Sequence, residues 1–120
     1  MQTTHGLVAI VEDDAPMRRS LERLLRASNF STIGFASAEA FLESGIADRA
    51  LGLVLDIHLE GMSGIELCRR LSAAGSKLPV VFITAFDDEA TRAEALAVGG
   101  VDCLHKPFEA HQLTEALLRG

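Results

Sequence analysis

The sequence predicts an α/β domain built around a parallel sheet. Short aliphatic runs recur along the chain, three of them are continuous rather than alternating, and segments with helical periodicity separate them. A continuous apolar run indicates a strand that is covered on both faces, which in practice means a parallel sheet. We therefore expect the 120 residues to form one α/β sandwich of five strand–helix units.

Each expected strand is short and aliphatic. In chain order the strands are "LVAIV" (7–11), "STIGFA" (31–36), "LGLVL" (51–55), "PVVFI" (79–83) and "VDCLH" (101–105). After each run, apolar residues recur three or four positions apart, as on one face of a helix. These stripes are Met17, Leu21, Leu24 and Leu25; Ala38, Phe41 and Leu42; Ile65, Leu67, Cys68 and Leu71; Ala93, Leu96 and Ala97; and Leu113, Leu117 and Leu118.

Local signals for helix starts and stops agree with this division. Pro16 suits the first position of a helix, and Ser37 is a good N-cap. Ser63 and Glu66 have the spacing of a capping box. Glycines follow three helical segments, at Gly45, Gly75 and Gly99–Gly100.

Composition argues against several functional classes. The formal net charge of -6 repels a phosphate backbone, and aromatic residues are scarce, so we expect no direct binding of nucleic acid. No apolar run approaches the roughly 20 residues of a membrane span. The start of the chain also lacks signal-peptide features, so we expect a cytoplasmic protein. Cys68 and Cys103 have no metal-ligand spacing and are expected to be reduced core residues.

Polar residues follow four of the five expected strands. They are Glu12 and Asp13 after the first, Asp56 after the third, Thr84 after the fourth and Lys106 after the fifth. The carboxyl ends of parallel strands lie at one edge of a sheet, so these groups should converge there. If the strand order is 2-1-3-4-5, Asp13 and Asp56 face each other closely.

This expected cluster has the composition of a phosphoryl-transfer site. Carboxylates so close repel one another unless one is protonated or a cation lies among them. Carboxylate oxygens suit Mg²⁺, and Lys106 adds a second positive charge. Phosphoryl transfer requires such groups, because negative charge spreads over the oxygens of the moving group. We therefore interpret Asp56 as a nucleophile.

Four segments together resemble the signatures of bacterial response-regulator receiver domains, which act in two-component signalling. They are "AIVEDDAPMRRSL", "VLDIHLEGMSGIEL", "VVFITAF" and "LHKPF", in the order and spacing of that family. The endings "KPF" and "MSGIEL" are most similar to the FixJ-type branch. The resemblance implies a flavodoxin-like, doubly wound (βα)5 fold with strand order 2-1-3-4-5 and helices on both faces. It also implies one receiver domain over residues 1–120 and no output domain in this chain.

Position by position, the resemblance implies a Mg²⁺ site, in which Mn²⁺ can substitute. Asp13 would bind the metal directly, Glu12 through water, and the backbone carbonyl of His58 would complete the protein ligands beside Asp56. Asp14, one place further, is expected to serve as a charge at a helix start.

The resemblance also assigns the phosphoryl chemistry. Asp56 would accept a phosphoryl group from a histidine kinase or a phosphotransfer protein. Thr84 would hydrogen-bond this group and move toward it, while Lys106 would pair with the acidic cluster or the phosphate. Pro107 commonly follows a cis peptide bond in such domains, which an X-Pro bond permits at low cost.

Two positions depart from the family pattern. Cys103 stands where the family usually has Tyr or Phe as a rotameric switch coupled to the threonine. Cys103 cannot swing a ring, so we expect the coupling from Thr84 to the surface to differ. Glu60 stands where the family often has Pro, which places an acidic, more flexible loop beside Asp56.

The leading hypothesis is a phosphorylation-controlled switch that changes its partner surface and controls transcription through an output domain or a partner. It is not an enzyme beyond its own phosphorylation and dephosphorylation. The alternatives are a binding module that works without phosphorylation and a Mg²⁺-dependent aspartyl-phosphate hydrolase. The hydrolase is disfavoured because it usually needs an acid two residues after the nucleophile, where this chain has His58.

A partner surface is expected on the fourth helix, fifth strand and fifth helix, through which a homodimer could form. Leu96 and Val98 of the fourth helical segment are expected to lie mostly in the core. Any apolar side chain left exposed beside Cys103 would add to that surface.

Overall fold

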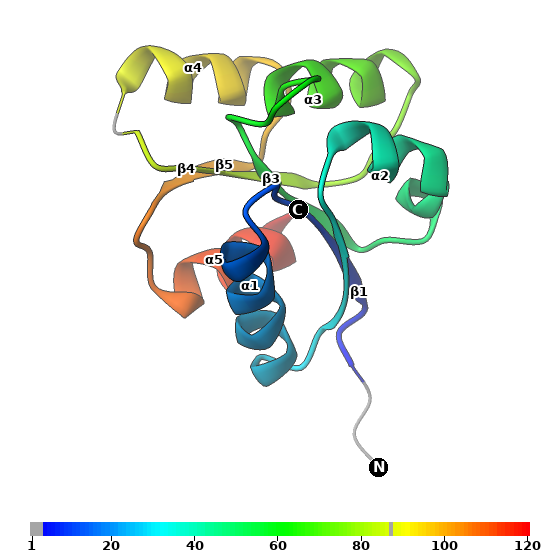
Figure 1. Ribbon diagram of the computed structural model, residues 1–120, viewed down its shortest axis with the longest axis vertical. Helices are drawn as coiled ribbons and strands as arrows, with labels where there is room; N and C mark the ends of the chain where they lie inside the picture. The colour runs from blue at the N-terminus through cyan, green and yellow to red at the C-terminus, as the bar shows by residue number, and fades with distance from the viewer. Residues whose placement is uncertain (1–3, 87) are drawn as a thin grey trace.

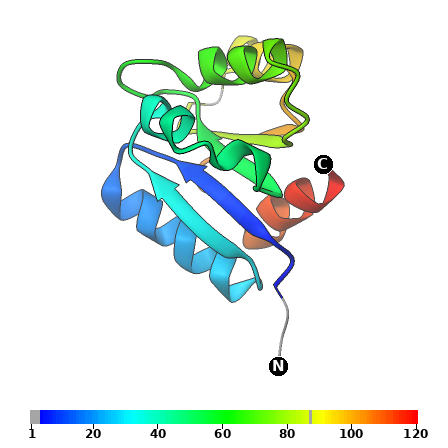
Figure 2. The same cartoon turned by 90° about the vertical axis from the view of Figure 1, so that its right-hand side faces the viewer.

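The computed structural model describes residues 4–86 and 88–120. Five parallel strands form one sheet with helices on both faces (Figures 1 and 2). The strands are β1 (Leu7–Val11), β2 (Ser31–Phe35), β3 (Gly52–Asp56), β4 (Val80–Thr84) and β5 (Asp102–His105). Their order is β2-β1-β3-β4-β5. The predicted α/β fold and the strand order 2-1-3-4-5 are therefore confirmed.

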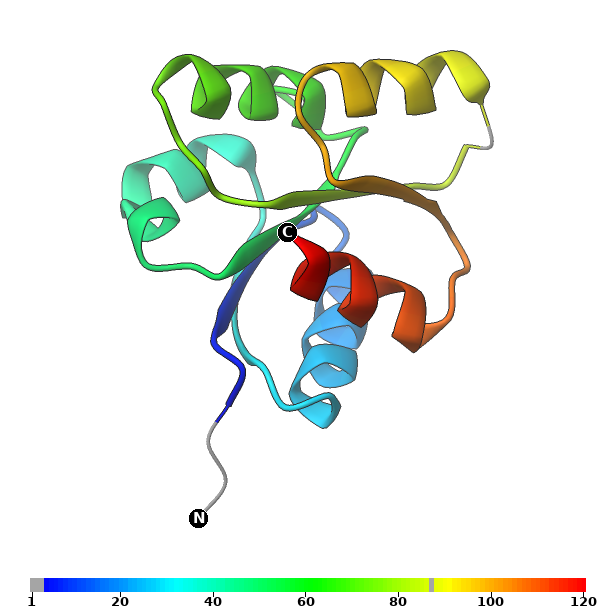
Figure 3. The same cartoon turned by 180° about the vertical axis from the view of Figure 1, so that it is seen from behind.

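Five α-helices cover the sheet, two on one face and three on the other (Figures 1 and 3). They are α1 (Ala15–Ala27), α2 (Ala38–Ser44), α3 (Gly64–Ala73), α4 (Glu89–Ala97) and α5 (Ala110–Arg119). Helices α1 and α5 share one core, whereas α2, α3 and α4 share the other. A single turn of 3-10 helix, η1 (Ile46–Asp48), follows α2 and was not predicted.

Side chains of the continuous apolar strands point alternately to the two faces of the sheet, so each strand contributes to both cores. In β1, Val8 and Ile10 point into the core beneath α1 and α5, and Ala9 and Val11 point into the core beneath α2 and α3. All five residues of β3 and of β4 are buried. This two-sided burial explains why these strands show no polar–apolar alternation in the sequence.

Side-chain caps fix the helix starts where the sequence predicts them. The side chain of Asp14 accepts a hydrogen bond from Met17 N–H (3.0 Å), so Asp14 is the N-cap of α1. Ser37 and Ser63 cap α2 and α3 in the same way. Each cap satisfies a backbone donor that the first helical turn leaves unpaired. The expected role of Asp14 as a helix-start residue is confirmed.

The predicted apolar stripe of α4 is wrong. Ala93, Leu96 and Ala97 are exposed, with Leu96 42% accessible, and the helix instead buries Ala95. Because α4 is rich in alanine, several faces have similar apolar character, and packing decides between them. Ala95 is fully buried and belongs to the core that α4 shares with α2 and α3.

Three further apolar positions differ from or refine the predicted pattern. Leu42 in α2 and Leu118 in α5 belong to predicted stripes but are exposed. Val98 is half-buried and packs against the core of α2, α3 and α4, as expected. Within the described parts of the chain, no helix has the length and apolar character needed to cross a membrane.

Candidate functional site

The polar residues predicted to converge do so at the carboxyl edge of the sheet. Glu12 follows β1, Asp56 and Thr84 end β3 and β4, and Lys106 follows β5. Pairing of Asp56 with Ile83 puts Thr84 one residue further along the same edge. The amide of Lys106 donates to the Thr84 carbonyl at 2.7 Å, which continues the sheet pattern beyond β5. Four separate segments thus meet at one place.

Three carboxylates at this edge form a candidate metal site. Glu12, Asp13 and Asp56 each offer an oxygen, and these oxygens lie within 4.8 Å of one another. Glu12 is 2% and Asp56 6% exposed, whereas Asp13 is open to solvent. Hard oxygen donors with one open side suit Mg²⁺, which keeps several waters in its shell. The donor set therefore fits this ion.

Lys106 provides the positive charge nearest to the buried carboxylates. Its Nζ lies 3.3 Å from Glu12 Oε2 and 3.5 Å from Asp56 Oδ2. The Lys106 side chain is mostly buried, so water screens these contacts less than it would on an open surface. One ammonium group cannot neutralise three carboxylates, so a second cation would still be favoured.

The crowding of acids is reflected in the pKa of Glu12. The pKa of Glu12 is raised from 4.5 to about 7, mainly by burial and then by a hydrogen bond with Asp56 and the charge of Asp56, while Lys106 lowers it. Without a metal ion the cluster therefore holds a proton near neutral pH. A divalent cation would favour the ionised form and release that proton.

Hydrogen bonds and close packing fix the backbone that follows Asp56. The amide of His58 donates to Asp56 Oδ1 at 3.0 Å, which orients the carboxylate. The amide of Glu60 donates to Asp13 Oδ2 at 3.2 Å. A Cβ at Gly64 would collide with the Asp56 carbonyl oxygen, so the start of α3 reaches this place only because residue 64 is glycine. The loop after β3 is thereby fixed against the acidic cluster.

Thr84 is buried, and its Oγ1 accepts a hydrogen bond from Phe86 N–H at 3.1 Å. Phe86 is 59% exposed, and its ring lies 4.8 Å from the His58 ring in an edge-on contact. His58 is exposed, and the Phe86 ring lies against one side of its imidazole.

Cys103 is buried and is a free thiol, as is Cys68. Burial raises the pKa of both thiols, which keeps them protonated and weakly reactive. Arg92 Nη1 of α4 donates to the Cys103 carbonyl at 2.8 Å, so α4 is tied to β5 at the position that departs from the family. The bond between Lys106 and Pro107 is cis, as the resemblance implied.

Sequence reasoning missed the residues that support the site from outside it. Arg18 Nη1 donates to the Glu12 carbonyl at 2.7 Å, and Glu39 accepts from Met62 N–H at 3.1 Å. Phe86 and Arg92 were likewise not singled out. Arg18, Glu39 and Arg92 lie within helices, with no spacing that links them to the acidic residues. Phe86 follows Thr84 by two positions, but an apolar side chain there has no feature that assigns it a role at the site.

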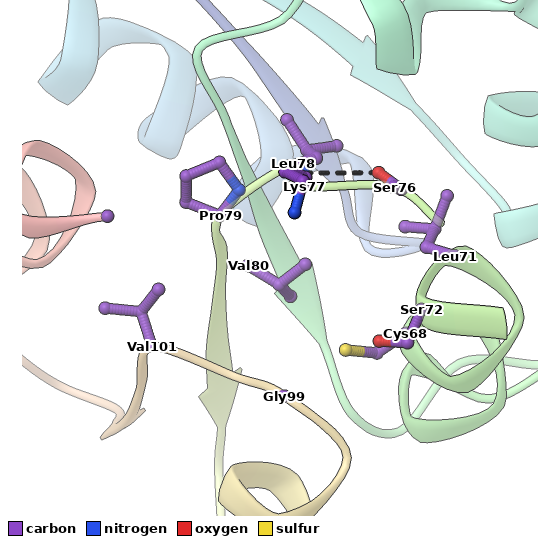
Figure 4. Close-up of a pocket in the computed structure, with 11 residues that line it drawn as sticks. Cys68, Leu71, Ser72, Ser76, Lys77, Leu78, Pro79, Val80, Gly99 and Val101 are labelled. Carbon is purple, nitrogen blue, oxygen red and sulfur yellow. Dashed lines mark hydrogen bonds between the residues drawn. The ribbon is translucent and has the colours of Figure 1, made fainter. Parts of the chain in front are cut away.

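A separate cavity lies at the opposite edge of the sheet (Figure 4). It has a volume of about 250 Å³ and lies between the end of α3, the start of β4 and the segment before β5. Cys68, Pro79 and Val101 are among its lining residues. None of the residues predicted for the site lines it. The candidate site and this cavity are therefore distinct features of the molecule.

Comparison with known proteins agrees with this geometry. Nodulation protein W of Bradyrhizobium diazoefficiens is 37% identical over 116 residues, which are 97% of this chain and 51% of that protein. Transcriptional regulatory protein FixJ of the same organism is 39% identical over 113 residues, which are 93% of this chain and 55% of that protein. The chain thus spans about half the length of the curated relatives it matches.

A solved structure shows the same likeness in three dimensions. The crystal structure of FixJ-N aligns with a TM-score of 0.86 at 37% identity, and the match covers 99% of this chain and 94% of that one. Five parallel strands in the order 2-1-3-4-5 with helices on both faces define a flavodoxin-like receiver fold. Residues 8–118 match the response regulator receiver domain family, and the chain belongs to this family of two-component signal transduction. The predicted likeness to the FixJ-type branch is also confirmed.

Proposed function

We propose that this domain is a switch controlled by phosphorylation of Asp56. The observation that carries the proposal is the position of Lys106 Nζ, 3.5 Å from Asp56 Oδ2 and within reach of Glu12. A buried carboxylate beside an ammonium group and two further acids is costly for a structural residue. A nucleophile that works with a metal ion requires this arrangement.

The metal would be held by Glu12, Asp13, Asp56 and the backbone carbonyl of His58. Mg²⁺ is the favoured ion, and Mn²⁺ can substitute, because both prefer carboxylate, carbonyl and water oxygens. When bound, the ion supplies charge that neutralises the oxygens of the transferred group. The carboxylates of Glu12 and Asp13 would hold it beside Asp56.

In the transfer step, a carboxylate oxygen of Asp56 forms a bond to phosphorus while the bond from phosphorus to the donor nitrogen of a phosphohistidine breaks. The departing imidazole takes a proton from solvent. Lys106 would stabilise the charge on the phosphoryl oxygens, and the hydroxyl of Thr84 would donate a hydrogen bond to one of them. The Thr84 oxygen accepts from Phe86 N–H, so a movement of Thr84 toward the phosphoryl group would shift this bond and link phosphorylation to the loop before α4.

The donor and the output follow from the family. We propose that a histidine kinase or a phosphotransfer protein supplies the phosphoryl group in the cytoplasm. Relatives named as transcriptional regulators support a role in transcription control through an output domain or a partner. The 120 residues would act as one receiver domain, catalysing at most their own phosphorylation and dephosphorylation. A homodimer through α4, β5 and α5 is part of this proposal.

Acetyl phosphate and intact-mass measurement test the proposal. With Mg²⁺, the wild-type chain should gain one phosphoryl group, and Asp56→Asn should gain none. Asp48→Asn, which removes an exposed carboxylate away from the acidic cluster, should behave as wild type. If the wild-type chain gains no mass, or if Asp56→Asn gains as much, the proposed function is wrong.

A binding module that works without phosphorylation is the second candidate, and Cys103 favours it because no ring at this position can couple Thr84 to the surface. The two candidates differ in the effect of phosphorylation. A phosphorylated chain whose amide resonances on α4 and β5 match those of the unmodified chain would favour the binding module. The hydrolase alternative would require turnover of small phosphate esters that Asp56→Asn abolishes.

A further inference from the structure

Three carboxylates hold the loop between β3 and α3 by its backbone. Alternate amides of this loop point to carboxylates that come from three different elements of the fold. The bonds are His58 N–H to Asp56 Oδ1 (3.0 Å), Glu60 N–H to Asp13 Oδ2 (3.2 Å) and Met62 N–H to Glu39 Oε2 (3.1 Å). The loop therefore has one anchor on β3, one after β1 and one on α2.

The third anchor differs from the other two. Asp56 and Asp13 are proposed metal ligands, so an ion would compete with the loop amides for their oxygens. Glu39 lies in the first turn of α2, outside the acidic cluster. Its bond to Met62 can persist while the metal site fills, which makes it the anchor that is independent of the ion.

Gly61 leaves the space that the Glu39 carboxylate occupies beside the loop. This glycine has a φ of +76°, in the left-handed region that favours glycine. A Cβ at Gly61 would lie 2.8 Å from Glu39 Oε2, so a side chain there would push the carboxylate away. Glu39 thus reaches Met62 N–H because Gly61, the residue before Met62, has no side chain and adopts a left-handed backbone conformation.

We propose that Glu39 is a positioning residue for the metal site. It fixes Met62, and with it the loop whose His58 carbonyl is a proposed ligand. The inference rests on the proposed function, because it concerns the affinity of that site for Mg²⁺. The competing explanation is that Glu39 only provides negative charge at the start of α2, where the helix dipole favours it.

Two substitutions separate position from charge. Glu39→Gln loses the charge but keeps an oxygen that can accept from Met62 N–H. Glu39→Asp keeps the charge but shortens the side chain by one methylene, so the carboxylate withdraws from Met62. Glu43→Gln removes the same charge from an exposed residue at the other end of α2 and serves as the control.

Mg²⁺ binding should be followed by ¹H–¹⁵N NMR titration, since the chain has no Trp or Tyr to serve as a fluorescent probe. We expect Glu39→Asp to raise the Mg²⁺ dissociation constant about fivefold, as for the loss of one hydrogen bond. The Met62 amide of this variant should also exchange faster with solvent in the metal-free protein. Glu39→Gln and Glu43→Gln should remain within about twofold of wild type on both readouts.

Other outcomes overturn the inference in distinguishable ways. If wild type binds Mg²⁺ and Glu39→Asp binds it equally well, Glu39 has no positioning role, and the proposed function stands. If Glu39→Gln is the impaired variant and Glu39→Asp is not, charge rather than position accounts for the effect. If wild type itself binds no Mg²⁺ at millimolar concentration, the proposed function fails and the inference fails with it.

Discussion

The carboxyl and amino edges of the sheet differ in the side chains that they bury. At the carboxyl edge lie all the buried polar side chains of the described chain, Glu12, Asp56 and Thr84, close to the ammonium group of Lys106. At the amino edge lies the cavity of Figure 4, with Pro79 and Val101 in its lining. Among the described residues, charge is taken out of water at the first edge alone, and this costs stability unless a ligand compensates it. The carboxyl edge therefore combines buried charge with the proposed binding site, whereas none of the proposed site residues lines the cavity at the amino edge.

Glycine substitutions should reveal this difference most strongly. Gly64→Ala would drive a Cβ into the backbone of Asp56, which cannot move without disturbing the site. We expect it to lower the free energy of unfolding by about 3 kcal/mol. Gly52→Ala, in β3 near the amino edge, would meet the flexible tip of Leu117 and should cost about 1 kcal/mol.

Urea denaturation of both variants measures these costs. Equal destabilisation by the two substitutions would show that the backbone at Asp56 is no more constrained than the amino edge.

The charge of Glu12 should make the metal-free domain less stable as pH rises. Its pKa is about 7 in the folded state and 4.5 as the ordinary value, so the folded state binds the proton more tightly. This contribution to stability is complete below pH 4.5 and is lost as pH rises through about 7. Glu12→Gln cannot ionise, so relative to wild type it should gain about 2 kcal/mol between pH 5 and pH 8 without Mg²⁺.

Thermal unfolding at the two pH values, with a chelator present, checks this prediction. Asp48→Asn should show no such gain, because this carboxylate is exposed. A pH-independent difference between Glu12→Gln and wild type would contradict the raised pKa.

The smallest effect is expected for Leu96→Ala on α4, where the exposed and buried faces differ from the predicted ones. Leu96→Ala removes an exposed side chain and should change the free energy of unfolding by no more than about 0.5 kcal/mol. Ala95→Leu would overfill the buried face and should cost about 2 kcal/mol. A larger cost for Leu96→Ala than for Ala95→Leu, measured by chemical denaturation, would reverse the assignment of the two faces.

Much of the fold could be predicted from the sequence because its signals are local. Continuous apolar runs identified buried strands, and Ser37 and Ser63 marked helix starts by direct capping. The convergence of Glu12, Asp56 and Lys106 followed from the rule that parallel strands share one carboxyl edge. The orientation of α4 did not follow, because alanine fits several faces and tertiary packing decides which of them is buried.

The supporting residues could not be predicted for a different reason. Glu39 contacts Met62 across 23 residues of sequence, and the contact depends on the left-handed turn at Gly61. Phe86 lies against His58 because two loops from neighbouring strands meet. Such contacts depend on how loops fold over the sheet edge, and no periodicity or motif in a single chain encodes them.

The most direct test of the account compares the two edges in one experiment. Beryllofluoride, which mimics a phosphoryl group, should be added with Mg²⁺ to the ¹⁵N-labelled chain, and amide shifts should be measured throughout. We expect large shifts at Thr84 and Lys106, smaller ones at Gly99 and Val101 by the cavity, and none of these changes in Asp56→Asn. Shifts of equal size at both edges, or unchanged resonances at Thr84 and Lys106 when Mg²⁺ is shown to bind, would contradict it.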